Sequence, residues 1–134
     1  MRFDFIVPGI PRTRQTKKAR SRKQWQERVR VAALLEWPLD RPPLTQEMSA
    51  VVIHYFTEKS DIDVDGIGKL VLDALKGAVI EDDRAISQVI LRKSNQVDLL
   101  ISNPPPVLAD ALGSHENFVY VQLNEAPNHE ELPE

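Results

Sequence analysis

The chain has 134 residues, of which 42% are hydrophobic, and this size and composition fit one compact domain. It contains no cysteine, which excludes disulfides and thiolate metal sites. No apolar stretch approaches the roughly 20 residues of a membrane span, and the first four residues do not open a signal peptide. We therefore expect a soluble, cytoplasmic protein without a membrane partner, folded as a single domain over residues 1–134.

The net charge of −3 hides an uneven distribution of charges. Nine of the 17 Lys and Arg residues lie between Pro11 and Arg30, with Glu27 the only acidic residue there, whereas the tail from about residue 125 is acidic. Clustered basic side chains are typical of a nucleic-acid site, because each phosphate contact releases condensed counterions. A solvated helix face beside a basic loop is the alternative. The candidate DNA-binding residues are Arg12, Arg14, Lys17, Lys18, Arg20, Arg22, Lys23 and, further along, Lys76.

Residues 2–8 are rich in β-formers and predict a first strand that ends at a proline. The basic segment 12–20 is expected to be a loop. Ser21 and Gln24 fit a capping box, which predicts a helix from about Arg22 to Trp37, ended by the proline that follows. The proline-rich residues 38–46 are a connection.

Residues 48–57 are β-branched and aromatic and predict a strand, and the apolar spacing over 64–79 predicts a second helix. Strands are expected again at 86–93 and 117–123, while 95–116 fits no element well. The order β-α-β-α-β-β indicates an α+β fold, with a mixed sheet and two helices packed on one face.

One stretch combines acidic and basic side chains at helical spacing. At about 100° per residue, Asp65 and Lys69 lie one turn apart on the side of the second helix opposite its apolar residues. Asp63 comes just before the helix and is free to point back toward Asp65. Asp82 and Asp83 begin the following strand, and we expect a turn to bring one of them alongside.

Carboxylates gathered in a small volume repel one another, and such oxygen-rich clusters suit Mg²⁺ or Mn²⁺. A divalent ion held by two or three aspartates polarises a phosphate oxygen and generates hydroxide at neutral pH, and a nearby lysine stabilises the extra negative charge on phosphorus. Each feature alone has a simpler explanation: a helix N-cap, a surface ion pair, or a polar turn. Their order along one chain is more specific than any of them.

That order resembles the signature of the RusA-type Holliday junction resolvases. The matching residues are Asp63-Val-Asp65-Gly66-Ile-Gly-Lys69-Leu-Val-Leu-Asp73-Ala-Leu75, followed by Asp82-Asp83. The opening Ile6-Val-Pro-Gly-Ile-Pro11 and the basic loop after it also resemble the start of that family. The similarity covers roughly residues 2–94, with a further match at the final strand.

The resemblance implies Mg²⁺-dependent nicking of four-way DNA junctions by a homodimer, in recombination and repair, with Mn²⁺ as a possible substitute and no small-molecule cofactor. Carried over by position, Asp63, Asp65 and Asp83 are metal ligands, Asp82 is a further candidate ligand, and Lys69 is the catalytic lysine.

Two features depart from the family pattern. Gly66 stands where the family usually has asparagine, which removes a polar side chain and loosens the start of the helix. The stretch 95–116 is longer than the turn expected there. The enzyme is therefore expected to be a junction resolvase or a nuclease that acts on other branched DNA. Two hypotheses from other classes remain open. One is a non-catalytic DNA-binding module of the same fold, and the other is an interaction domain whose basic arm binds an acidic protein.

Overall fold

The computed structural model describes residues 2–12, 18–57, 62–96, 103–114 and 116–126. Within these ranges the chain forms a four-stranded sheet and three α-helices, with a short 3₁₀ turn before the third strand. The elements are β1 (Arg2–Pro8), α1 (Ala19–Glu36), β2 (Met48–Phe56), α2 (Val64–Leu75), η1 (Asp83–Ala85), β3 (Ile86–Asn95), α3 (Pro106–Gly113) and β4 (Phe118–Glu125). The predicted α+β fold with a mixed sheet is confirmed.

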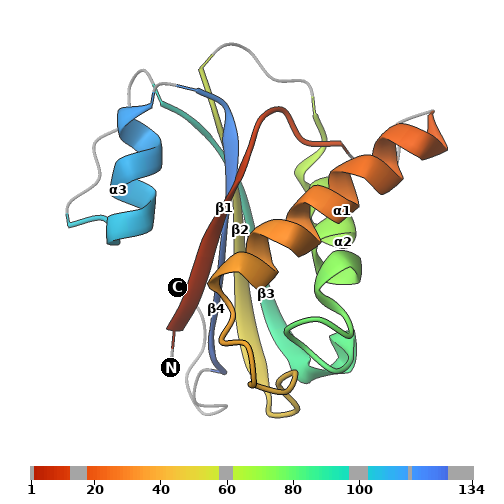
Figure 1. The fold of residues 1–134 in the computed structure, drawn as a ribbon. Helices are drawn as coiled ribbons and strands as arrows, with labels where there is room; N and C mark the ends of the chain where they lie inside the picture. Colours follow the sequence, from red (N-terminus) through yellow and green to blue (C-terminus); the bar gives the residue numbers. More distant parts are fainter. Residues whose placement is uncertain (1, 13–17, 58–61, 97–102, 115, 127–134) are drawn as a thin grey trace.

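The strand order is β1-β4-β2-β3. β4 lies antiparallel to both β1 and β2, whereas β3 runs parallel to β2 at the edge of the sheet. A parallel pair needs a crossover, and α2 supplies it. α2 therefore begins near the end of β2 and finishes near the start of β3 (Figure 1).

The helices lie on both faces of the sheet. α1 and α2 cover one face, as predicted, and α3 covers part of the other (Figure 1). The strands alternate accordingly: Val52 and Val121 belong to the core under α1 and α2, while Ile53 and Tyr120 pack with Leu108 of α3. Among the described helices, none is long and apolar enough to cross a membrane.

α1 begins earlier than the capping box predicts. Its first residue is Ala19, its N-cap is Lys18, and no side chain caps the first turn. Ser21 therefore lies inside the helix. Ala19 and Arg20 are strong helix formers, so the helix can begin two residues before Ser21.

α2 ends at Leu75, four residues before the predicted end. Gly77 has a φ of 80° and turns the chain, and the backbone N–H groups of Ala78, Val79 and Ile80 all donate to the Leu75 carbonyl. These three apolar residues continue the helical spacing but are buried in a turn. The turn is fixed to the segment before β2, because Leu44 exchanges backbone hydrogen bonds with it.

Candidate functional site

An acidic pair lies at the start of α2. Asp63 is the N-cap, and its Oδ1 accepts a hydrogen bond from the backbone N–H of Asp65 at 3.2 Å. The Asp65 side chain is exposed and that of Asp63 half-buried. The free N–H groups of the first turn favour negative charge here, which offsets part of the repulsion between the two carboxylates. We call Asp63 and Asp65 the acidic pair.

The predicted lysine lies one turn further along α2. Lys69 is exposed and follows Asp65 by four residues, so the two side chains lie on one flank of the helix. Gly66 is buried, and the helix begins at Val64 in spite of it.

Asp82 and Asp83 form a second acidic group at the start of β3. Asp82 Oδ1 accepts from the backbone N–H of Arg84 at 3.2 Å, and its Oδ2 lies 3.3 Å from the Arg84 guanidinium. A side-chain hydrogen bond with Asp83 and the backbone hydrogen bond from Arg84 lower the pKa of Asp82 to about 2, and Lys76 adds a weaker effect in the same direction.

The two acidic groups lie at opposite ends of α2, so the structure does not bring Asp82 or Asp83 alongside the acidic pair within one chain. The reason is the direction of the crossover. β2 and β3 are parallel, so α2 runs back between them, and its start lies at the end of the sheet remote from the start of β3. Twelve helical residues separate the two ends by about 18 Å. Within the described ranges, no three His, Asp or Glu side chains are grouped closely enough to hold a metal ion.

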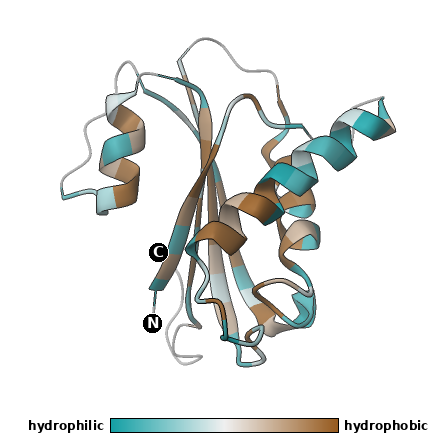
Figure 2. Cartoon of the chain, in the orientation of Figure 1, coloured by the Kyte–Doolittle hydropathy of each residue, from teal (hydrophilic) through white to brown (hydrophobic). Residues whose placement is uncertain are grey.

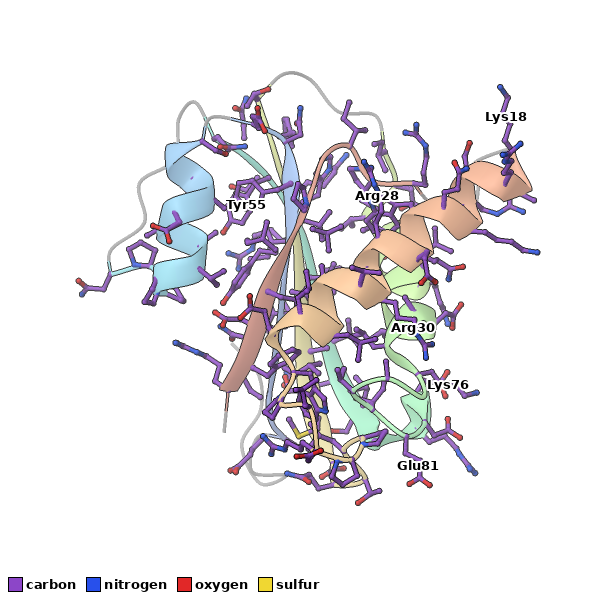
Figure 3. The ribbon with its side chains drawn as sticks, in the orientation of Figure 1. Lys18, Arg28, Arg30, Tyr55, Lys76 and Glu81 are labelled. Carbon is purple, nitrogen blue, oxygen red and sulfur yellow. The ribbon has the colours of Figure 1, made fainter. Side chains whose placement is uncertain are left out.

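The basic N-terminal turns of α1 lie at the same end of the molecule as the acidic pair. Gln26 Nε2 donates to the carbonyl of Leu70, so α1 and α2 pack side by side. Arg30 and Lys23 border the same shallow hollow as Asp73 of α2. β1 and β2 both run antiparallel to β4, so α1 and α2, which follow them, run back across the sheet in the same general direction, and the N-terminal turns of α1 lie toward the acidic pair. Figure 3 shows Lys18 at this end and Lys76 and Glu81 at the other.

Of the predicted DNA-binding residues, Arg12, Lys18, Arg20 and Lys23 are exposed and Arg22 is half-buried. Arg14 and Lys17 lie outside the described residues, as does most of the acidic tail. Lys76 is exposed but belongs to the end that carries Asp82 and Asp83.

Two features of the structure were not anticipated from the sequence. One is a groove of about 760 Å³ between α1 and residues 8–12, lined in part by Ile10, Val31 and Leu35, and Figure 2 shows the hydrophobic residues along this part of α1. The other is His54, which is 1% exposed on β2, and neither of its ring nitrogens has a hydrogen-bond partner in the described part of the chain. No sequence pattern predicts that a single histidine in a strand will be buried without a hydrogen-bond partner.

The model of one protein family, described as Endodeoxyribonuclease RusA, matches residues 8–101. The match spans β1's last residue, both helices of the first face, β2 and β3, and it includes the acidic pair, Lys69, Asp82 and Asp83. No curated protein matches the chain.

Proposed function

The chain belongs to the RusA family of endodeoxyribonucleases, and we propose that it is a divalent-metal-dependent nuclease that resolves four-way DNA junctions by paired nicks in recombination and repair. The observation that carries the proposal is the acidic pair at the start of α2, at the same end of the molecule as the basic turns of α1. Carboxylates beside a positively charged surface are what a metal-assisted attack on a phosphodiester needs.

The acidic pair fits Mg²⁺. This ion is commonly bound by one or two carboxylates together with waters and substrate phosphates, so Asp63 and Asp65 would supply two of its ligands. Mn²⁺ has the same preference for oxygen ligands. When bound, the ion supplies Lewis acidity and a bound water of lowered pKa.

The side chains of the chain itself have three tasks. The exposed Lys18, Arg20 and Lys23 bind phosphates on either side of the cut and so align the strand. Lys69 stabilises the additional negative charge that develops on the phosphate oxygens. The half-buried Asp63 is held in place by its hydrogen bond to the N–H of Asp65, so one ligand is already oriented before DNA binds.

Asp83 belongs to this site only if a second copy of the chain supplies it. Within one chain α2, about 18 Å long, separates the acidic pair at its start from the end of the molecule that carries Asp83. In a two-fold dimer, the Asp83 end of one chain can lie against the acidic pair of the other, and the symmetry then creates two equivalent sites. Two sites related in this way match the two opposed strands of a four-way junction.

The first experiment compares nicking of a labelled four-way junction with nicking of linear duplex, in Mg²⁺ and in EDTA. The wild-type chain should cut the junction only with the metal. Asp65→Asn should lower the nicking rate at least about 100-fold while leaving junction affinity within a few-fold. Asp110→Asn is the matched control, because Asp110 is an exposed aspartate on α3, on the other face of the sheet.

Each outcome decides something. Wild-type nicking by the Asp65→Asn protein would refute the site. Junction binding without any metal-dependent product would favour the non-catalytic DNA-binding module. Failure to bind branched DNA at moderate salt would favour the interaction domain with an acidic protein partner.

A second experiment tests where Asp83 acts. Asp65→Asn and Asp83→Asn are each expected to be inactive, and a mixture of the two is refolded together to form mixed dimers. If Asp83 acts on the acidic pair of the other chain, each mixed dimer contains one intact site, and single-strand nicking should return. If Asp83 acts within its own chain or only supports folding, the mixture should stay inactive.

A further inference from the structure

Lys93 lies near the end of β3, 24 residues beyond Lys69 and outside the helix, on the face of the sheet that α1 and α2 cover. Leu91 pairs with Val52, and both belong to the core beneath α1 and α2. Side chains alternate along a strand, so Lys93 lies on the same face as Leu91, and Arg92 lies on the opposite face.

The position of Lys93 along the sheet follows from the contact between Gly68 and Leu91. A Cβ built on Gly68 would meet Leu91 Cδ2 at 2.6 Å, so this point of α2 lies directly against the middle of β3. From Leu91, two residues along β3 advance Lys93 by about 6.6 Å. From Gly68, three residues back along α2 advance Asp65 by about 4.5 Å in the same direction, because α2 and β3 are antiparallel. Lys93 is therefore level with the start of α2.

The two side chains also share a flank of the helix. Asp65 is about 60° around the helix axis from Gly68, the residue that faces β3. Asp73, by contrast, borders a hollow with Arg30 on the α1 side. The Asp65 carboxylate therefore lies over the β3 edge, where the Lys93 side chain is exposed.

The residue that pairs with Lys93 on β2 is the buried His54. Its ring packs near the Phe56 ring, with 5.7 Å between ring centroids. Burial, and then the positive charge of Lys93, lower the pKa of His54 to about 4. The histidine is neutral at physiological pH, so it neither repels the ammonium nor competes with it for a phosphate.

We propose that Lys93 is a phosphate-binding residue of the acidic-pair site, which contacts the scissile phosphate from the β3 side while Lys69 contacts it from the helix side. The inference rests on the proposed nuclease function. The scissile phosphate carries two non-bridging oxygens, and the negative charge on both increases in the transition state. Two ammonium groups on opposite sides can stabilise both of them.

The experiment uses neighbouring residues of one strand. Lys93→Gln should lower the single-turnover nicking rate of a four-way junction by about 10- to 100-fold at saturating protein. Arg92→Gln removes the same charge one residue away but on the other face of the sheet, and its rate should stay within about two-fold. Lys93→Arg should keep most of the rate, because it keeps the positive charge. Lys93→Met keeps the aliphatic stem and should be as slow as Lys93→Gln, which separates loss of charge from loss of packing.

Equal rates for Lys93→Gln and Arg92→Gln, whether both normal or both slow, would overturn the proposal. Junction affinity, measured in EDTA, should fall by no more than a few-fold in Lys93→Gln, which loses one phosphate contact, and should be unchanged in Arg92→Gln, which loses none. A large affinity loss confined to Lys93→Gln with an unchanged saturated rate would also overturn it.

A second readout does not need nicking. Mn²⁺ added to ¹⁵N-labelled protein should broaden the amide signals of Asp65 and Lys93 at the same low concentration, and Asp65→Asn should abolish both effects. If the wild-type protein fails to cut but shows this broadening, the nuclease proposal fails and the placement of Lys93 stands. Broadening at Asp65 without broadening at Lys93 would refute the placement itself.

Discussion

His54 should make the folded chain less stable as the pH falls below neutrality. Its imidazole is 1% exposed, and no described residue is hydrogen-bonded to either ring nitrogen. Burial is the main cause that lowers its pKa from 6.5 to about 4, and the charge of Lys93 adds to the effect. The folded state therefore binds a proton more weakly than the unfolded state does.

The size of the effect follows from the two pKa values. Between pH 6.5 and pH 4 the unfolded chain carries a proton on His54 that the folded chain lacks, so stability falls as the pH falls. Each pKa unit corresponds to about 1.4 kcal/mol, which gives a loss of about 2 kcal/mol by pH 5 and about 3 kcal/mol in full. A loss of this size is a large part of the stability of a small domain.

Urea unfolding at pH 8, 6.5, 5 and 4 measures this loss, with His54→Leu as the reference. The variant keeps a similar volume but cannot titrate, and all other groups, including His115 and His129, are common to both proteins. The difference in free energy of unfolding between wild type and variant should shift against the wild type by about 2 kcal/mol from pH 8 to pH 5. A difference that is constant over this range would refute the argument, as would a His54 pKa above 6 measured by NMR.

Three further predictions follow from individual contacts. Gly77→Ala should lower the free energy of unfolding, measured by urea titration, by about 1–2 kcal/mol, because φ is 80° at this residue. Gly113 is the control, because it lies at the end of α3 with open space around it. Gly113→Ala should leave the free energy of unfolding unchanged or raise it by some tenths of a kcal/mol. Tyr120→Phe removes the hydroxyl that donates to Asp4 at 2.8 Å and should cost about 1–2 kcal/mol by the same measurement; a loss below about 0.3 kcal/mol would contradict it. Lys69→Ala should reduce the single-turnover nicking rate by at least about 10-fold with junction affinity nearly unchanged, and a loss confined to affinity would argue against its proposed role.

The elements that the sequence predicts well are those whose signal is local. β1 is found at its predicted residues, and α1 ends before the predicted proline, because strand alternation and a proline act over a few residues. α3 also had a local signal, a proline in its first turn and a glycine at its end. With only eight residues, its apolar spacing was too short to indicate a helix by periodicity.

The end of α2 could not be predicted from apolar spacing. Ala78 and Val79 are buried whether the chain continues as a helix or turns, so their hydrophobicity does not distinguish the two. The deciding contact is long-range, since Leu44 hydrogen-bonds to the turn from the segment before β2. A contact across 35 residues leaves no periodic signal in the sequence.

In the candidate site, too, some positions follow from local sequence and others depend on long-range contacts. Asp63 and Asp65 are two residues apart at a helix start, so their proximity follows from local geometry. The place of Asp83 depends instead on whether β3 runs parallel or antiparallel to β2. An antiparallel β3 would have begun at the acidic pair, but the parallel strand begins at the opposite end.

Because β3 runs parallel to β2, Asp83 and the acidic pair lie at opposite ends of one chain. If Asp83 completes the acidic pair only in an assembly of two chains, an isolated chain has two carboxylates and a weak hold on a metal ion, and cannot cut DNA effectively. Assembly then creates both sites together, so a nick in one strand is always accompanied by a complete site facing the opposed strand. A nuclease of branched DNA benefits from this coupling, because a junction cut on one strand alone remains unresolved. If the proposed dimer forms, the split of the carboxylates between the two ends of α2 would make cutting depend on the two-fold symmetry of the assembly, which matches the two opposed strands of the junction.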